Sequence, residues 1–211
     1  MTQTEPAPGT TARDAERAGA AARLARTVTR AVDPQNVIVG VLVLFGALRH
    51  HWSGVGWGLL AALFAGVIPQ GLITLGMRRG RVEDRYVGDR SKRSVVLPLV
   101  ALSVVAGLVL MLVLGAPRDL SAMLVAMLAT LVPILGITAG LRWKVSIHAA
   151  VTAGAVAMLA LALSAWWWCG LAVVAVVSWS RVVLRDHTAA QTVVGALVGA
   201  VTAGLVFSWA R

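Results

Sequence analysis

The chain carries a compact set of polar residues at the end of a long apolar run. Ser180-Arg181 is followed by His187 and then by Gln191, and a further apolar run begins there. An ionisable side chain at the centre of a membrane span costs about 2.5–3.5 kcal/mol, and less near the interface. Arginine binds phosphate oxygens through a charged fork, and histidine exchanges protons near neutral pH. These residue types therefore predict phosphate chemistry at a membrane interface.

A second polar group opens another apolar run upstream. It contains Lys144, Ser146 and His148, and a basic segment from Arg78 to Arg93 lies further towards the N-terminus. Phosphoryl transfer needs fixed positive donors, an in-line nucleophile and an acid for the leaving oxygen. Because consecutive membrane spans alternate in direction, all three polar stretches are expected on one side. We therefore expect them to form one site.

The spacing SRxxxxxHxxxQ from Ser180 to Gln191 resembles the third signature of the type 2 phosphatidic acid phosphatase superfamily, SRxxxxxHxxxD. The second signature, Pro-Ser-Gly-His, is similar to the stretch that ends in Ser146-Ile147-His148, where the serine and the histidine match. The first signature, KxxxxxxRP, is only suggested by the basic segment, where no residue pair reproduces it. The resemblance extends from about Arg78 to Phe207.

The resemblance implies a role for each of these residues. His187 would be the nucleophile that forms a phosphohistidine, His148 the acid for the leaving group, and Arg181 a clamp on the transition state. Lys144 and Ser146 would bind phosphate oxygens. The candidates for the lysine and arginine of the first signature are Arg85, Arg90, Lys92 and Arg93.

Two departures from the superfamily pattern affect these expectations. Gln191 stands where the superfamily has an aspartate that stabilises the developing positive charge on the nucleophile; its amide oxygen can orient the ring but carries no charge. Asp186 is next to His187 in the sequence and is expected to point elsewhere. Ser146 and His148 also lack the neighbouring proline and glycine that shape a phosphate cradle.

Composition indicates a membrane protein independently of any motif. Of 211 residues, 58% are hydrophobic and 13% are charged, and the mean hydropathy is +0.81. Soluble domains carry about 25% charged residues, so we expect an all-α, polytopic transmembrane helix bundle. The net charge is +10, and the basic residues lie beside the predicted spans, which favours membrane phosphates over nucleic acid as partners. The single cysteine, Cys169, excludes an intrachain disulfide and a cysteine-based metal site.

Residues 1–33 are expected to form a basic N-terminal segment, and residues 34–211 the membrane-embedded phosphatase-like domain. The N-terminal segment lacks the continuous apolar core of a secretory signal. From Thr11 to Val32 it is rich in alanine and arginine, which fits either a basic helix on the membrane surface or a flexible charged tail. Asp33-Pro34 predicts a helix start, with an aspartate N-cap and proline at the first helical position.

Seven apolar runs predict six or seven membrane spans, the first of which is short for a bilayer core of about 30 Å. The uncharged stretch from Val145 to Ser180 is too long for one span, and Trp166, Trp167 and Trp168 near its middle predict an interface between two helices. Further along, Gly195, Gly199 and Gly204 fit close helix packing. The runs are Pro34 to Leu48, Val55 to Met77, Val95 to Gly115, Leu120 to Leu141, Val145 to Ala165, Trp167 to Leu184 and Thr188 to Ala210.

Alternation of seven spans predicts the orientation of the protein. One side collects every basic residue except Arg49, Arg118 and Arg211. By the positive-inside rule this side is cytoplasmic, so we expect a multi-pass protein of the cell membrane whose N-terminus and site face the cytoplasm. Many bacterial members of the resembled superfamily act on the outer face instead. His50 and His51 fall on the side opposite the site and are expected to be interfacial.

The combined expectation is a lipid phosphatase or phosphotransferase that works through a phosphohistidine, without metal or cofactor, on an isoprenoid phosphate or a phosphatidic acid. The alternative is a non-catalytic membrane protein that binds or transports lipid phosphates. A third possibility is a purely structural multispan protein. Magnesium-dependent prenyltransferases need two acidic groups, whereas Glu83, Asp84 and Asp89 supply one. The sequence leaves the oligomeric state open.

Overall fold

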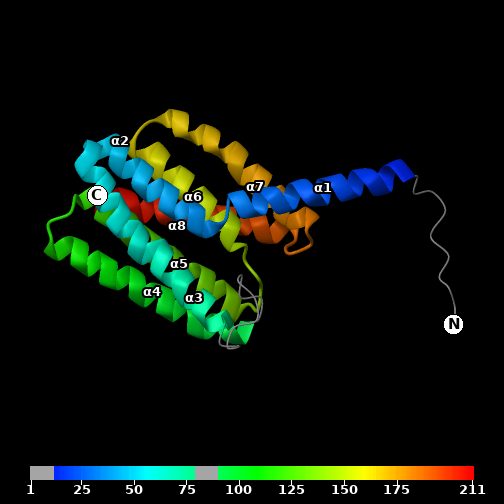
Figure 1. Ribbon diagram of the computed structural model, residues 1–211, viewed down its shortest axis with the longest axis horizontal. Coiled ribbons are helices and arrows are strands. Elements are labelled where there is room, and N and C mark those ends of the chain that lie inside the picture. Colours follow the sequence, from blue (N-terminus) through cyan, green and yellow to red (C-terminus); the bar gives the residue numbers. More distant parts are fainter. Residues whose placement is uncertain (1–11, 79–89) are drawn as a thin grey trace.

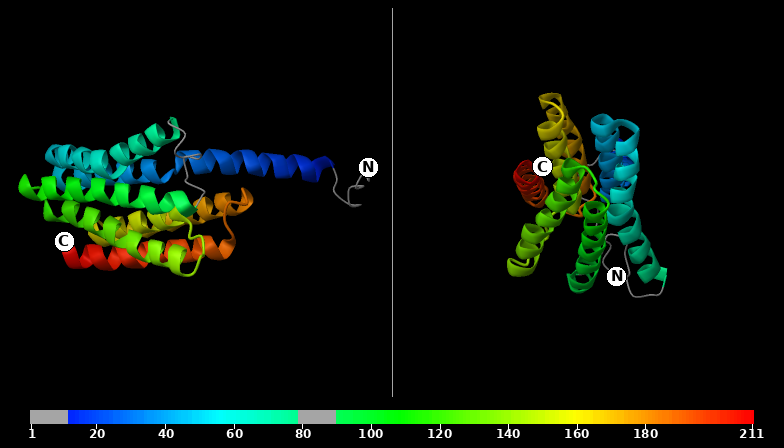
Figure 2. Two further views of the ribbon diagram at one scale, coloured as in Figure 1. Left: turned by 90° about the horizontal axis from the view of Figure 1, so that it is seen from below. Right: turned by 90° about the vertical axis from the view of Figure 1, so that its left-hand side faces the viewer.

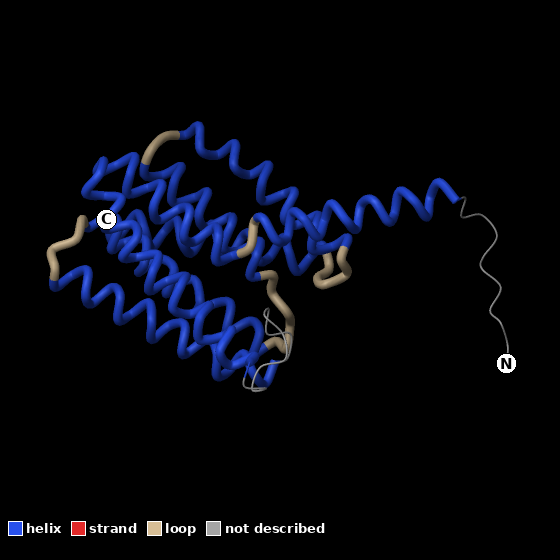
Figure 3. The backbone as a smooth tube through the Cα atoms, viewed as in Figure 1, coloured by secondary structure: helices blue, strands red, loops and turns tan. Residues whose placement is uncertain are grey.

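The computed structural model describes residues 12–78 and 90–211, and the side chains within 19–76 and 98–211. Every regular element in these ranges is a helix, as Figure 3 shows, which confirms the all-α class. The α-helices are α1 (Ala12–Ala31), α2 (Pro34–Ala62), α3 (Ile68–Arg78), α4 (Arg90–Val113), α5 (Arg118–Gly140), α6 (Ile147–Ala162), α7 (Leu171–Val183) and α8 (Ala189–Ala210). A π-helix, η1 (Leu63–Val67), joins α2 to α3, and a 3₁₀-helix, η2 (Ala165–Gly170), precedes α7.

Several of these helices are long and apolar enough to cross a membrane. Within the described part of the chain four helical segments meet both criteria, and two further apolar helices are shorter. The four are Pro34–Gly76, Arg118–Gly140, Ala165–Val183 and Ala189–Ala210; the two shorter ones are Pro98–Val113 and Ile147–Ala162. The structure thus agrees with the composition in indicating a helical membrane protein.

The longest segment is a hairpin rather than one straight helix. The backbone leaves the helical conformation at His50 and His51, where His51 has φ 53°. Gly46 and Gly54 face each other so closely across the two arms that a Cβ on either would collide with the carbonyl group of the other. Figure 1 shows the chain turning back after this point and continuing through α3 towards the other end of the bundle. The predicted break between two spans after Leu48 is therefore present.

The N-terminal residues that the structure describes form a helix that belongs partly to the bundle. Ala25 and Thr29 of α1 are buried, and α1 packs against α7, while its first part projects beyond the bundle (Figures 1 and 2). The helix ends before Asp33, whose side chain accepts a hydrogen bond from the Gln35 backbone N–H at 3.0 Å and caps α2. The helix start predicted at Asp33-Pro34 is confirmed.

Helices α6 and α8 form the most extensive contact in the bundle. A Cβ on Gly195 would lie 2.6 Å from the Ser146 carbonyl oxygen, and one on Gly199 would collide with the Ala150 backbone. Small residues thus allow the two backbones to approach, which is how helices associate tightly in a membrane. A Cβ on Gly204 would lie 3.3 Å from a methyl group of Leu161 and 3.8 Å from the Cβ of Ala157. The close packing predicted for these glycines is confirmed.

The end of the bundle near the C-terminus carries exposed tryptophans. Trp52, Trp166 and Trp209 are 84–88% exposed, at the hairpin tip, in η2 and at the end of α8. Tryptophan concentrates at membrane–water interfaces. The break in the long apolar stretch lies where Trp166–Trp168 predicted it, because α6 ends at Ala162 and η2 follows. The loop before α6 and the turn between α7 and α8 lie at the other end (Figure 1).

Candidate active site

The end of the bundle opposite the exposed tryptophans holds four buried polar side chains that the sequence singled out. Ser146 and His148 come from the start of α6, Arg181 from the last turn of α7, and His187 from the turn that precedes α8. Their exposed fractions are 0%, 4%, 5% and 8%. His148 lies within electrostatic reach of both Arg181 and His187. The structure therefore brings together the residues of the second and third polar stretches.

The turn after α7 orients His187. Arg185 adopts a left-handed conformation with φ 57°. Its N–H donates to the Val182 carbonyl oxygen at 2.9 Å, and the Asp186 N–H donates to the Arg181 carbonyl oxygen at 3.1 Å. These are the two hydrogen bonds of a Schellman C-cap. The His187 N–H reaches the same Arg181 carbonyl at 3.3 Å, so this cap joins the position of the histidine to the end of the helix that carries the arginine.

Gln191 fixes the tautomer of His187. The Thr188 hydroxyl accepts from the Gln191 N–H, and the Gln191 amide oxygen accepts from the Thr188 N–H at 3.2 Å, which forms a capping box at the start of α8. The same amide oxygen lies 3.1 Å from Nδ1 of His187. Because this oxygen can only accept, Nδ1 must donate. In the neutral ring Nε2 then keeps its lone pair, as a nucleophile or base requires.

Ser146 joins the start of α6 to the start of α8. Its hydroxyl oxygen accepts from the Ala149 N–H at 3.5 Å and caps α6. Its own N–H donates to the Gln191 carbonyl oxygen at 3.3 Å. A backbone hydrogen bond thus connects Ser146 to Gln191, the residue that orients His187. Ser146 therefore both caps α6 and connects the start of α6 to the start of α8.

The charge of Arg181 is balanced by Asp186, which was expected from the sequence to point away from His187. A terminal nitrogen of Arg181 lies 3.0 Å from a carboxylate oxygen of Asp186. The arginine side chain is 6% exposed and the carboxylate is 42% exposed, so the pair reaches from the interior to the surface. Asp186 does not replace the aspartate of the superfamily signature, since its contact is with the arginine and not with His187.

Burial lowers the pKa of His187 below its ordinary value of 6.5. The positive charges of Lys144 and Arg181 lower it further, because they disfavour a second cation nearby. Hydrogen bonds to Gln191 and to the Lys144 backbone act in the opposite direction but do not cancel the burial. The imidazole is therefore neutral near pH 7, and the loop that carries Lys144 lies beside it.

The candidates from the basic segment cannot be placed in the same detail. Arg85 and the acidic group Glu83, Asp84 and Asp89 lie outside the described residues. Arg90, Lys92 and Arg93 belong to the first turn of α4, and their side chains are also outside the described part. The start of α4 lies at the same end of the bundle as the loop before α6 (Figure 1). Their binding of phosphate stays a prediction.

One contact at the site was absent from the sequence-based expectations. The Ser180 hydroxyl donates to the Val177 carbonyl oxygen at 2.7 Å and lies 3.1 Å from the Thr29 hydroxyl. Since Ser180 has a single hydroxyl proton, Thr29 must be the donor of the second bond. This bond ties α1 to the residue that precedes Arg181. In the sequence, the small residues Ala25 and Thr29, one helical turn apart, could indicate that this face of the helix packs against another element. They do not indicate which element that is.

The arrangement offers a fixed cation, a neutral imidazole with an oriented lone pair and a second histidine. These groups suit an anion with an electrophilic centre, such as a phosphate ester. Among the described residues, no group of three or more His, Cys, Asp or Glu side chains is arranged to hold a metal ion. Comparison of the chain with protein-family models, with characterised proteins and with solved structures gives no match.

Proposed function

We propose that the protein is a lipid phosphatase or phosphotransferase that acts through a phosphohistidine on His187. One observation carries this proposal. His187, His148, Arg181 and Ser146 are buried together at one end of the bundle, and Gln191 holds His187 through Nδ1. A buried cation in a membrane protein is costly, and such residues commonly mark functional sites. The order and spacing of the same residues resemble the superfamily signatures.

In the first step of the proposed reaction, Nε2 of His187 attacks phosphorus in line with the leaving oxygen. The P–O bond to the lipid breaks, and His148 donates a proton to the departing alcohol or phosphate. Arg181 stabilises the charge on the equatorial oxygens, together with Lys144 and the start of α6. This step requires His148 to carry the proton when the substrate is bound.

In the second step, a water molecule attacks the phosphohistidine. His148, now neutral, accepts a proton from this water; the P–N bond breaks and inorganic phosphate leaves. If an alcohol takes the place of water, the same step transfers the phosphoryl group. Gln191 orients the ring throughout, but as a neutral amide it stabilises the cationic ring less than a carboxylate would.

The proposal includes a membrane arrangement. The hairpin of α2 and α3 supplies two crossings, and α4, α5, α6, α7 and α8 supply five more. The site then lies at the cytoplasmic interface, where a substrate presents its phosphate. Helix α8 is 22 residues long, which corresponds to about 33 Å. That length matches a bilayer core of about 30 Å.

A lipid-phosphate binder is the second candidate, and one observation favours it. The partner of His187 is Gln191, whose amide oxygen lies 3.1 Å from Nδ1. A neutral amide stabilises a cationic phosphohistidine less than a carboxylate would, whereas phosphate binding by the Arg181 guanidinium does not require a charge at this position.

The experiment that separates these functions is phosphate release by the purified protein in detergent. Substrates would include phosphatidic acid, lysophosphatidic acid and prenyl mono- and diphosphates, all with EDTA present. We expect release by the wild type and loss of at least about 10³-fold in His187→Ala. Intact folding of the variant would be checked by thermal melting. Wild-type protein that binds these lipids without releasing phosphate would support the binder instead.

A further inference from the structure

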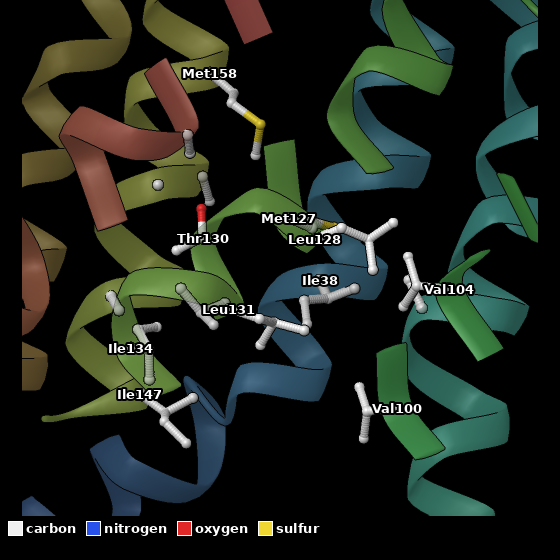
Figure 4. Close-up of a pocket in the computed structure, with 16 residues that line it drawn as sticks. Ile38, Val100, Val104, Met127, Leu128, Thr130, Leu131, Ile134, Ile147 and Met158 are labelled. Carbon is white, nitrogen blue, oxygen red and sulfur yellow. The ribbon is translucent and has the colours of Figure 1, made fainter. Parts of the chain in front are cut away.

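The cavity inside the bundle, between α2, α4, α5 and α6, does not suit a charged ligand. Its volume is about 90 Å³, and Figure 4 shows Ile38, Val104 and Met127 around it. The hydroxyl of Thr130, the one polar side chain among the residues that line it, donates to the Ala126 carbonyl oxygen at 2.8 Å. Burying an unpaired charge among apolar side chains is costly. An anionic partner for the basic residues outside the candidate active site is therefore expected on the surface.

Three arginines form an exposed row on α1, the helix that projects from the bundle. Arg23, Arg26 and Arg30 are all exposed, and their spacing of three and four residues places them on one face of the helix. Ala25 and Thr29 are buried on a neighbouring face, and α1 packs against α7. This arginine row is therefore open to the surroundings, while its helix is held on the bundle.

The arginine row lacks an acidic partner in the described part of the chain. The sequence has no aspartate or glutamate between Glu16 and Asp33, and the Asp33 side chain caps α2 instead. Among the described residues, none of the three arginines takes part in an ion pair. Like charges three or four residues apart on a helix repel each other. An anionic partner would therefore relieve the repulsion within the row.

The arginine row lies at the depth of lipid headgroups. Helices α1 and α2 follow one another along the long axis of the molecule (Figures 1 and 2), and the first arm of α2 ends at His50, near the exposed Trp52. At about 1.5 Å per helical residue, Arg30 lies about 30 Å and Arg23 about 40 Å from His50. A bilayer has a hydrocarbon core of about 30 Å and a thickness of about 40–45 Å with its headgroups. With the tryptophans at one interface, the row extends from the edge of the core at the other interface into the headgroup layer.

We propose that the arginine row binds the phosphate groups of anionic phospholipids in the leaflet at the site end of the bundle. A guanidinium group forms two hydrogen bonds to one phosphate and keeps its charge, and basic residues clustered beside a membrane span attract anionic lipids. The depth of the row favours a lipid over a soluble polyanion such as RNA. Because Thr29 contacts Ser180, the bound lipid lies on a helix that is joined to the candidate active site. The inference needs only the bilayer and the exposed charges, so it does not rest on the proposed function.

Quenching of a fluorophore beside the row tests this inference in vesicles. In a Cys169→Ser background, Thr27→Cys places a bimane label among the arginines, because Thr27 is exposed and adjoins Arg26. The full-length protein would be reconstituted with a fixed share of phosphatidylcholine that carries a nitroxide on its headgroup. Replacing unlabelled phosphatidylcholine with phosphatidylglycerol should displace the nitroxide lipid from the label. We expect the share of phosphatidylglycerol around the label to exceed its share in the vesicle by about fivefold or more, since each arginine near a membrane surface contributes about that factor.

Two sets of substitutions in the same labelled background serve as controls. The combination of Arg23→Gln, Arg26→Gln and Arg30→Gln keeps a high helix propensity but removes the charge, and it should abolish the enrichment. Lysine at the same three positions keeps the charge and should retain most of it, and about 1 M salt should weaken it by screening. Equal displacement of the nitroxide lipid in the wild-type row and in the glutamine variant would overturn the inference. A label that the headgroup nitroxide does not quench would place the row beyond the headgroups and overturn it in favour of a soluble polyanion.

Discussion

At His187, the neighbouring groups determine which ring nitrogen carries the proton and whether the ring is charged. The Gln191 amide oxygen makes Nδ1 the donor, and burial with the charges of Lys144 and Arg181 lowers the pKa. A carboxylate in place of the amide would still accept from Nδ1, but it would raise the pKa, because it favours the imidazolium form. Glutamine thus gives a ring that is oriented but kept neutral. The nucleophile is available at neutral pH, while its phosphorylated, cationic form lacks a charged partner.

This balance predicts how stability depends on pH. The pKa of His187 in the folded protein lies below 6.5, so below pH 6.5 the unfolded chain binds a proton that the folded protein resists. Stability is therefore fully present above pH 6.5 and falls as the pH decreases below it. His187→Gln should flatten this decrease in melting temperature, measured in detergent between about pH 7 and 5. A pH dependence unchanged in the variant would assign the effect to other groups.

The partner of the ring gives a second test. Gln191→Glu keeps the length of the side chain and its place in the capping box but adds a negative charge beside Nδ1. We expect the pKa of His187 to rise, because an opposite charge favours the protonated ring. In the proposed enzyme the acid limb of the profile of kcat/KM against pH should move to higher pH. Gln191→Leu, which removes the acceptor, should move it to lower pH and lower the rate.

Among the helices, composition and the simple rules of helix capping predict a large part of the fold. The runs of apolar residues, Asp33-Pro34 and Trp166–Trp168 each mark a feature that the structure contains. The contacts that complete the site could not be predicted in the same way. The pairing of Arg181 with Asp186 depends on a left-handed Arg185, and that of Thr29 with Ser180 joins residues far apart in the chain. Neither follows from periodicity, since the first depends on the conformation of the turn after α7 and the second on the packing of α1 against α7.

The contact between α6 and α8 gives a prediction at this scale. Gly195→Ala would place a methyl group 2.6 Å from the Ser146 carbonyl oxygen, and a backbone cannot yield as a side chain does. We expect a loss of about 1–3 kcal/mol in stability and a loss of activity, because Ser146 and Gln191 lie at this contact. Gly136→Ala is the matched control: nothing lies within 4 Å of its Cβ. Thermal melting should show Gly136→Ala to be neutral or slightly stabilising.

For the whole molecule, the two ends of the bundle differ in chemistry. One end carries the exposed Trp52, Trp166 and Trp209. It also carries a cluster in which Nε2 of His50 lies 2.8 Å from Asp119, and Arg49 lies 3.4 Å from it. The other end carries the buried site. Because α1 packs against α7 and Thr29 contacts the residue before Arg181, the side of the membrane assigned to the end of α1 applies to the site as well.

This arrangement makes the orientation of the protein measurable with one native residue. Cys169 is exposed in η2, at the tryptophan end, and it is the only cysteine in the chain. With basic residues concentrated at the site end, the positive-inside rule predicts that a membrane-impermeant maleimide labels Cys169 in intact cells. In a Cys169→Ser background, Thr27→Cys on the exposed face of α1 should react only after the membrane is permeabilised. The reverse pattern would place the site on the outer face, where a phosphatase would receive its lipid from the opposite leaflet.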